Sequence, residues 1–170
     1  MVLDVFEVSK AASGELPVKP ERLDLAKLLR QTMADMQPHI DAAPVQLRPA
    51  LPEEPVFITT DGDRLYRVFQ NLLQNALQYA LEGSRVYLSL TVEEGRAVVS
   101  VKNTSRTELP ADVDFTARFV RGDPSRTDGG SGLGLAIAQS FTQACGGTLT
   151  VAPVADLFVV TVTFPVTENA

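Results

Sequence analysis

The sequence predicts a two-layer α/β sandwich, in which a mixed β-sheet of about five strands carries three helices on one face. Three segments repeat apolar residues at helical spacing, and several short segments alternate apolar and polar residues as half-buried strands do. The chain has 170 residues and 45% apolar content, enough for one compact domain with its own core. We expect one domain over residues 17–170, with the other face of its sheet largely exposed or in contact with helices outside this chain.

The first elements follow a short tail. Residues 1–16 read as a helical or extended tail without a core of its own, and residues 17–23 predict an edge strand. Asp24 can then cap the first helix, which Pro38 should kink or end. Its apolar face is formed by Leu25, Leu28, Leu29, Met33 and Met36.

A second helix follows two predicted strands at residues 45–51 and 56–61. Asp61 can cap this helix, because apolar residues recur after it at steps of three and four. Those residues are Leu65, Val68, Phe69, Leu72, Leu73, Ala76 and Leu77. A different stripe of the same helix carries Asn71, Asn75, Gln78 and Tyr79.

The second half of the chain predicts a hairpin, a long loop, a helix and two strands. Residues 85–92 and 96–103 flank the turn "EEGR", and a loop at about 103–131 is long enough to indicate a functional lid or disorder. A glycine cluster then opens the third helix, which Gly146 and Gly147 close. Residues 148–154 and 157–165 predict the final strands.

Composition excludes several classes of protein. Fifteen Lys and Arg stand against 21 Asp and Glu, a net charge of -6, which argues against a protein that binds nucleic acid. The single cysteine, Cys145, predicts a small core residue rather than a nucleophile, because no histidine stands near it. No stretch approaches the roughly 18 apolar residues of a membrane span, and no signal pattern opens the chain.

The glycine cluster suggests a ligand. Gly130, Gly132 and Gly134 let the backbone approach an anion, while the free N–H groups at the start of a helix supply positive potential. The alternative is a flexible hinge whose glycines serve only the turns. The cluster is not a P-loop, since no Lys and Ser/Thr follow its last glycine.

Four motifs in order make the pattern specific: "DGDRLYRVFQNLLQNALQYA", "VKNTSRTEL", "ARFVRGDPSR" and "GGSGLGLAIAQSFTQACGG". This arrangement, over residues 24–165, resembles the ATP-binding catalytic domain of sensor histidine kinases. The motifs correspond to the family's N-box, a degenerate first glycine box, a phenylalanine-type box and a glycine-rich box. The same superfamily holds the gyrase, Hsp90 and MutL ATPases, so the resemblance implies the Bergerat-type ATP-binding fold.

The resemblance implies ATP and Mg²⁺ as ligands and assigns residues to them. Asn75 matches the residue whose amide oxygen ligates Mg²⁺, and Asn71 faces the same cleft one turn earlier. Tyr79 matches a ring that packs on adenine, although an ordinary core aromatic is the alternative. Gln78 replaces a lysine that reaches phosphate. The remaining ATP-binding candidates are Asn103, Arg121, Gly130, Ser131, Gly132, Leu133 and Gly134, where Arg121 could equally be a solvated loop arginine.

The first glycine box departs most from the family pattern. The family has an Asp that accepts a hydrogen bond from the adenine amino group, and Asn103 occupies that position. An amide oxygen can still accept this bond, but without a full charge. The usual Gly-Thr before the last strand is also missing, with Leu157 and Phe158 near that place. We expect adenine recognition in weakened or altered form.

Asn71 distinguishes two enzyme classes. The ATPase relatives carry at this position a Glu that acts as general base on water, whereas an amide cannot take a proton at neutral pH. The pattern therefore favours an ATP-dependent protein-histidine kinase, which positions ATP, Mg²⁺ and a separate acceptor. The only histidine, His39, lacks the sequence surroundings of the family's phosphoacceptor, and a surface or packing role is the better interpretation.

These inferences set expectations for the longer protein. Residues 1–16 would be the remnant of a dimerisation helix or linker, and the partners would be the dimerisation and phosphoacceptor domain and a response regulator. We expect a monomeric cytoplasmic domain, without direct membrane contact, of a protein in a bacterial cell membrane. The alternatives are a nucleotide-sensing or protein-docking module of the same fold and an anti-sigma-type serine kinase, which Asn71 and the opening tail disfavour.

Overall fold

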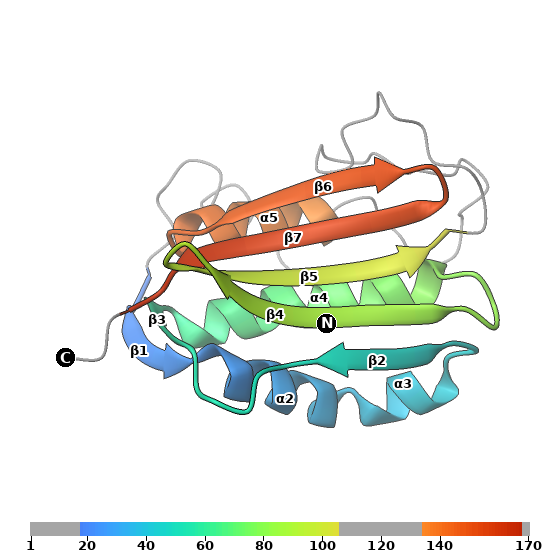
Figure 1. Cartoon of the computed structure of the whole chain (residues 1–170), viewed down its shortest axis with the longest axis horizontal. Helices are drawn as coiled ribbons and strands as arrows, with labels where there is room; N and C mark the ends of the chain where they lie inside the picture. The colour runs from blue at the N-terminus through green and yellow to red at the C-terminus, as the bar shows by residue number, and fades with distance from the viewer. Residues whose placement is uncertain (1–17, 106–133, 168–170) are drawn as a thin grey trace.

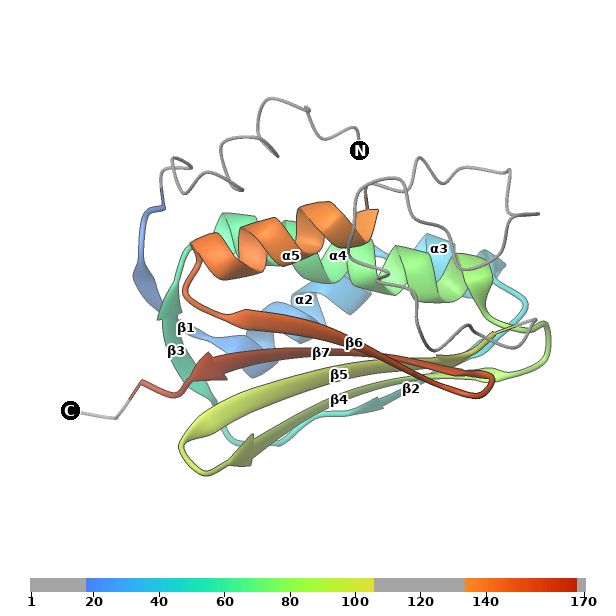
Figure 2. The same ribbon diagram turned by 90° about the horizontal axis from the view of Figure 1, so that it is seen from above.

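The computed structural model describes residues 18–105 and 134–167, and within these ranges a five-stranded mixed sheet carries helices on one face (Figures 1 and 2). The predicted two-layer α/β fold is confirmed. The strand order is β2-β4-β5-β7-β6. The five strands are β2 (Gln46–Ala50), β4 (Arg85–Glu93), β5 (Arg96–Thr104), β6 (Thr148–Val154) and β7 (Leu157–Pro165).

One strand pair in this sheet is parallel. β2 pairs in parallel with β4, whereas β4, β5, β7 and β6 pair antiparallel with their neighbours. The predicted hairpin joins β4 to β5 through Glu94 and Gly95, which have φ angles of 51° and 76°. Two successive positive φ angles suit the right-handed twist of a two-stranded ribbon. The tight turn explains why a glycine follows the two glutamates in "EEGR".

A small second sheet lies beside the main one. β1 (Glu21–Asp24) pairs antiparallel with β3 (Phe57–Thr60). The predicted edge strand at 17–23 therefore exists, but it begins later and joins β3 rather than the five-stranded sheet. The Thr167 N–H donates to the Phe57 carbonyl at 2.7 Å, and the Arg22 guanidinium lies 3.9 Å from the centre of the Phe57 ring. The first contact ties the end of the described chain to β3, and the second ties β1 to β3.

The helices cover one face of the sheet. They are α2 (Leu25–Asp35), α3 (Gln37–Ala42), α4 (Gly62–Tyr79) and α5 (Gly134–Ala144). The Asp24 carboxylate accepts from the Ala26 N–H at 3.0 Å and caps α2 as predicted. Pro38 ends this helix by standing in the first turn of the next one, where a missing N–H costs nothing. The sequence predicts three helices, and the described residues add the short α3.

The core fills the space between the sheet and the helices. Phe69 of α4, Phe141 of α5 and Phe164 of β7 are fully buried and join the two layers. Alternate residues of β4 and β5 point into this core, whereas the residues between them face outward. Tyr87 on the outward face is 45% exposed. One face of the sheet is thus packed, and the other is uncovered by the described residues.

Two glycines end α5, as the sequence predicts. The Gly147 N–H donates to the Thr142 carbonyl at 2.9 Å, and the Gly146 N–H donates to the Gln143 carbonyl at 3.1 Å. Gly146 has a φ of +90°, the left-handed conformation that closes a helix without penalty only in glycine. A Cβ on Gly147 would lie 2.6 Å from the Phe164 ring. The helix end therefore packs directly on β7.

Replacing Gly147 by alanine should destabilise the protein by about 1–3 kcal/mol, because the added methyl group overpacks against the buried Phe164 ring. Urea unfolding followed by circular dichroism measures this loss. Gly147 does not have a positive φ, so backbone strain does not contribute to this loss. A Gly147→Ala variant that is as stable as the unchanged protein would contradict the steric argument.

Cys145 is a core residue, as the sequence predicts. Its side chain is 7% exposed, and burial raises the pKa of the thiol above its usual value. Because the thiolate is the reactive form, both effects slow modification. We expect a disulfide reagent at pH 8 to react with the folded protein more than about tenfold slower than with the protein in urea. Equal rates, measured by absorbance, would show that the thiol is accessible in the native state.

Candidate functional site

The predicted site is built on α4, and local sequence fixes where this helix begins. The Asp61 carboxylate accepts from the Arg64 N–H at 3.2 Å and from the Lys19 N–H at 3.1 Å. Every apolar residue predicted for the inner face is buried. The cap and the apolar face together set the rotation of the helix, so the polar stripe with the two asparagines points away from the core.

The stripe residues differ in exposure. Asn71, Asn75 and Gln78 are half-buried, so each can still reach a ligand from the surface of the helix. Tyr79 is only 9% exposed and belongs to the buried face of α4. Its ring therefore lies at the boundary between the polar stripe and the core. This position agrees with both a core aromatic and a ring that an adenine could cover on one side.

The end of α4 meets the end of β5. The Leu81 N–H donates to the Thr104 carbonyl at 2.8 Å, and Ala80 forms an isolated β-bridge with Ser105. Asn103 follows Val99 and Val101 in the alternation of β5, so its side chain faces the helix layer and is 3% exposed. Two motifs separated by more than twenty residues thus meet at one edge of the sandwich.

α5 lies beside α4 and runs in the opposite direction. Figure 2 shows the start of α5 over the central part of α4, with its end near β1 and β3. The Arg64 guanidinium lies 5.5 Å from the centre of the Phe141 ring, a cation–π contact that joins the two helices. The positive end of the α5 dipole is therefore directed toward the half of α4 that carries Asn71 and Asn75.

Several predicted residues cannot be placed. Gly134 is the first residue of α5, as expected of the last glycine in the cluster. Arg121, Gly130, Ser131, Gly132 and Leu133 lie outside the described residues, and so does most of the predicted lid at about 103–131. Of that range, Asn103 and Thr104 belong to β5. The roles assigned to the five other residues stay predictions.

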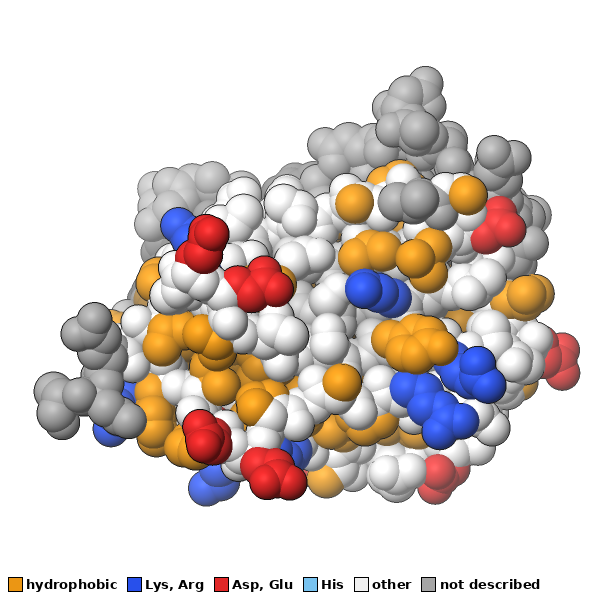
Figure 3. Space-filling view, viewed as in Figure 1, with side chains coloured by type: hydrophobic (Ala, Val, Ile, Leu, Met, Phe, Trp, Pro, Cys, Tyr) orange, Lys and Arg blue, Asp and Glu red, His pale blue; other side chains and the backbone are white. Residues whose placement is uncertain are grey.

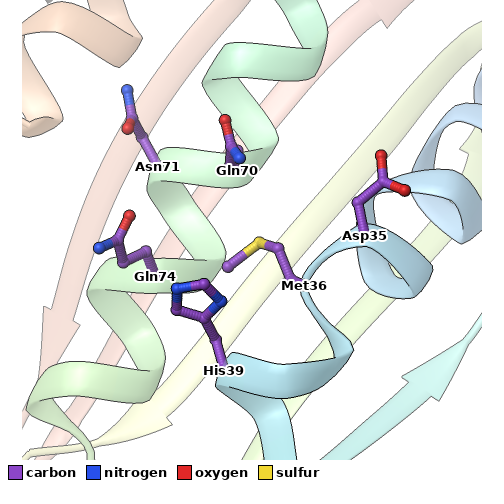
Figure 4. A pocket seen from close by; sticks show the side chains of 6 residues that line it. All are labelled: Asp35, Met36, His39, Gln70, Asn71 and Gln74. Carbon is purple, nitrogen blue, oxygen red and sulfur yellow. The ribbon is translucent and has the colours of Figure 1, made fainter. Parts of the chain in front are cut away.

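The structure also forms a small open cavity that sequence reasoning missed. It has a volume of about 130 Å³ and lies between α4 and the junction of α2 with α3 (Figure 4). Its lining consists of Asp35, Met36, His39, Gln70, Asn71 and Gln74. Asn75, Tyr79 and Asn103 do not line it. Periodicity marks Gln70 and Gln74 only as outward-facing, so no pattern in the sequence indicates a cavity there.

Asp35 in this cavity already has its hydrogen bonds. Its two carboxylate oxygens accept from the Tyr66 hydroxyl at 2.6 Å and from the Gln31 amide at 2.9 Å. The hydrogen bond to Asp35 is the main cause that raises the pKa of Tyr66 above its usual value. His39 is exposed on α3, in agreement with a surface role. The cavity therefore brings together hydrogen-bonding groups rather than an acid–base pair.

The described residues offer a limited donor set for a metal. They contain no group of three or more His, Cys, Asp and Glu side chains that could hold an ion by themselves. The amide oxygen of Asn75 is a hard ligand on a half-buried stripe, and Mg²⁺ accepts one such ligand when phosphates and water complete its shell. Asn75 is therefore compatible with a Mg²⁺ ion that is also bound by the phosphates of a nucleotide. Among the described helices, none is long and apolar enough to cross a membrane.

Comparison with known families identifies the arrangement. The model of the family described as histidine kinase-, DNA gyrase B- and HSP90-like ATPase matches residues 60–168. The chain belongs to this family. The match begins immediately before the Asp61 cap of α4 and continues through β7, so it includes the asparagine stripe, the end of β5 and α5.

The curated proteins that are similar to this chain include sensor histidine kinases. The chain is 40% identical to sensor histidine kinase RppB of Synechocystis over 113 residues, which are 65% of this chain and 25% of RppB. It is 32% identical to sensor histidine kinase WalK of Bacillus subtilis over 154 residues, which are 88% of this chain and 25% of WalK. The chain thus spans about a quarter of the length of these relatives.

Solved structures show the same fold. The mycobacterial sensor histidine kinase MprB superposes with a TM-score of 0.73 at 23% identity, covering 89% of this chain and 100% of that one. Full-length ShkA in complex with AMPPNP gives a TM-score of 0.76 at 23% identity, covering 98% of this chain and 35% of ShkA. The chain is an ATP-binding catalytic domain of the two-component sensor histidine kinase type.

Proposed function

We propose that this catalytic domain binds Mg·ATP beside the asparagine stripe of α4 and passes the γ-phosphoryl group to a histidine on a dimerisation segment outside this chain. The observation that carries the proposal is the meeting of α4 with the Asn103 end of β5, in a chain that belongs to the histidine kinase ATPase family. Backbone contacts there join the end of the helix that carries the proposed phosphate-binding residues to the end of the strand that carries the proposed acceptor for the base.

Asn75 supplies the protein's ligand to the metal. Its half-buried amide oxygen would bind Mg²⁺, which draws charge from the phosphate oxygens when it is bound. Asn71 lies one turn earlier and holds no proton-accepting group at neutral pH, so it can orient a phosphate or a water but not activate that water. The helix therefore favours transfer to an acceptor over hydrolysis. Gln78 adds a neutral hydrogen bond where a cation would be stronger.

The amide oxygen of Asn103 would accept a hydrogen bond from the adenine amino group. The side chain is 3% exposed on the helix-covered face of β5, where a hydrogen bond is poorly screened by water. Tyr79, at the end of α4, provides an aromatic surface near the same edge. Arg121 and the segment Gly130 to Gly134 would complete the phosphate side of the site.

The acceptor and the downstream partner belong to the longer protein. His39 is exposed on α3 and lines the cavity beside Asn71, and we assign it no acceptor role. The phosphoryl group would pass from the acceptor histidine to a response regulator. The full-length kinase would lie in a bacterial membrane with this domain in the cytoplasm, as in other sensor kinases of this kind.

Two measurements test the proposal. Calorimetric titration with a non-hydrolysable ATP analogue should give saturable binding that Mg²⁺ strengthens, and no binding at millimolar analogue would contradict the nucleotide site. Incubation with ATP and a dimerisation segment supplied in trans should then give an acid-labile phosphoryl group on that segment. An acid-stable product would instead indicate a serine kinase.

A second candidate function is a nucleotide-sensing or protein-docking module. Gln78 in place of a cation and Asn103 in place of a carboxylate favour it, because both weaken the interactions that hold ATP. The two candidates differ in the assay with a supplied acceptor. Nucleotide binding without any phosphoryl transfer would favour the sensing module, whereas transfer would exclude it.

Restoring the carboxylate should tighten nucleotide binding. Asn103→Asp places a charged acceptor opposite the adenine amino group, and we expect about tenfold stronger ATP binding, or about 1.4 kcal/mol. Calorimetry measures the change, and urea unfolding checks that the buried charge leaves the domain folded. Asn103→Leu keeps a similar volume without an acceptor and should weaken binding. Unchanged affinity in both variants would show that Asn103 does not contact the base.

A further inference from the structure

The outward face of the sheet carries an unusual basic cluster around Tyr87. Arg48 of β2, Tyr87 of β4 and Lys102 of β5 are direct neighbours across three strands, and Arg85 stands two residues before Tyr87 on the same face. Adjacent strands lie about 4.8 Å apart, so the three cations surround the ring within about 10 Å. All three are exposed in a protein whose net charge is -6.

These cations are not neutralised by the described part of the chain. Arg48 hydrogen-bonds the Gln46 side chain at 2.8 Å, and no described carboxylate forms a salt bridge with Arg85 or Lys102. Glu82 and Asp156 stand in the turns that precede β4 and join β6 to β7. The outward face therefore presents positive charge and a 45% exposed tyrosine at this end.

The opposite end of the same face is acidic. Glu93 ends β4, Glu94 lies in the β4–β5 turn, and Glu53 and Glu54 lie in the exposed connection from β2 to β3. Figure 3 shows acidic side chains toward the left of this face and a group of basic ones right of its centre beside hydrophobic side chains, with some basic side chains at the left margin and some acidic ones at the right margin. Arg96 is the register partner of Glu93, and the Arg30 guanidinium donates to the Pro52 carbonyl beside Glu53, so two cations reduce the negative charge of the four carboxylates without cancelling it.

A second copy turned by 180° would match this pattern. The two charged ends are separated by the six residues from Tyr87 to Glu93, or about 20 Å. A two-fold axis midway between them places the basic end of each copy over the acidic end of the other. One of the two outward rows beside that midpoint carries small side chains across all five strands, which leaves room for a close approach: Ala50, Ser89, Ser100, Thr161 and Thr150.

The size of the face suits a modest interface. Five strands of five to nine residues, about 4.8 Å apart, cover about 600 Å² per copy, or about 1,200 Å² in total, at the lower end of the range of specific protein interfaces. We propose that the outward sheet face is an isologous self-association surface, in which the Arg48, Arg85 and Lys102 cluster of one copy binds the Glu53, Glu54, Glu93 and Glu94 end of another. This proposal replaces the monomer that the sequence predicts.

The pairing would leave the candidate nucleotide site open. The helices with Asn71 and Asn75 cover the other face of the sheet, so both sites of a dimer would point outward (Figure 2). Nucleotide binding and self-association can therefore be tested separately, and the failure of one says nothing about the other.

Sedimentation velocity of the whole 170-residue chain tests the proposal. The average mass should rise from monomer to dimer between about 10 and 500 μM at low salt, and the dimer should weaken at least about tenfold in 0.5 M NaCl because exposed charges are screened. A monomer at every protein and salt concentration would overturn the proposal. The outward sheet face would then be a candidate contact surface for another domain of the longer protein.

Charge-reversed variants make the test specific. The double variant Arg85→Glu with Lys102→Glu should be monomeric, and so should Glu93→Lys with Glu94→Lys. Mixed together, these two variants should form a heterodimer, because both of its charged contacts are again complementary. The control Lys19→Glu with Lys27→Glu changes the charge equally away from this face and should still dimerise. The pairing would be contradicted if the mixture of the two double variants stayed monomeric, or if either double variant still dimerised by itself.

Discussion

Replacing Asn75 by alanine is expected to abolish Mg²⁺-dependent nucleotide binding. The half-buried amide oxygen is the protein's one proposed ligand to the metal, and the described residues contain no group of three or more His, Cys, Asp and Glu side chains that could hold the ion in its place. Loss of such a contact to a charged group costs about 2–3 kcal/mol, on the order of 100-fold in affinity. Calorimetry with an ATP analogue, with and without Mg²⁺, measures the loss directly.

Gln74 provides the matched control for this experiment. It stands immediately before Asn75 but is exposed and lines the cavity beside α3, so Gln74→Ala should bind nucleotide as the unchanged protein does. The residual Mg²⁺-independent binding of the Asn75→Ala variant reports the contacts to the base. If Asn75→Ala retained full affinity in the presence of Mg²⁺, Asn75 would not be the metal ligand.

Replacing Phe141 by alanine should cost about 3–5 kcal/mol of stability, a large part of the stability of a domain of this size. Its ring is fully buried between α5 and the rest of the core, and the Arg64 guanidinium packs over it. The variant loses burial, leaves a cavity, and breaks the cation–π contact that joins α5 to α4. Urea or thermal unfolding would show a much lower midpoint, or a chain that no longer folds.

Phe141→Leu separates packing from the cation–π contact. Leucine fills most of the volume but offers no ring to Arg64, so we expect a smaller loss of stability than with alanine. The Arg64→Met variant should remove the cation while keeping the ring. An alanine variant as stable as the leucine variant would mean that the site collapses without a cavity, against the close packing seen around this ring.

Periodicity alone predicts most of the local structure. The apolar repeat from Leu65 to Leu77 gives α4, with its Asp61 cap, and the alternation in residues 85–92 and 96–103 gives the β4–β5 hairpin. These signals are strong because one face of each element is buried and the other is not. The helix end at Gly146 is also predictable, since glycine is favoured wherever φ is positive.

Strand pairing is less predictable. β1 and β2 are both short and mostly exposed, and nothing in their sequences indicates that β1 joins β3 while β2 lies parallel to β4. Those choices depend on contacts between residues far apart in the chain, which a local pattern does not record. The separate α3 escapes prediction for a similar reason, because Pro38 is compatible with both a helix end and a helix start.

The site is predicted in part. The resemblance places Asn75 and Asn103 in one site, and the structure brings the helix and the strand that carry them to one edge through the Ala80–Ser105 bridge. The sequence does not decide how deeply Tyr79 is buried, because a residue at the border of an apolar stripe can turn either way. It also gives no sign of the cavity between Asp35, His39 and Gln74, which forms only where two helices meet.

The strand order has a consequence for synthesis of the protein on the ribosome. β7 is later in the chain than β6, yet it lies between β5 and β6 in the sheet. Until β7 has been translated, β5 has one unpaired edge and the apolar side chains beneath it lack part of their cover, a state open to aggregation. The sheet cannot close progressively as the chain emerges. Slow translation or a stop before residue 157 should therefore leave a nascent chain that depends on chaperones.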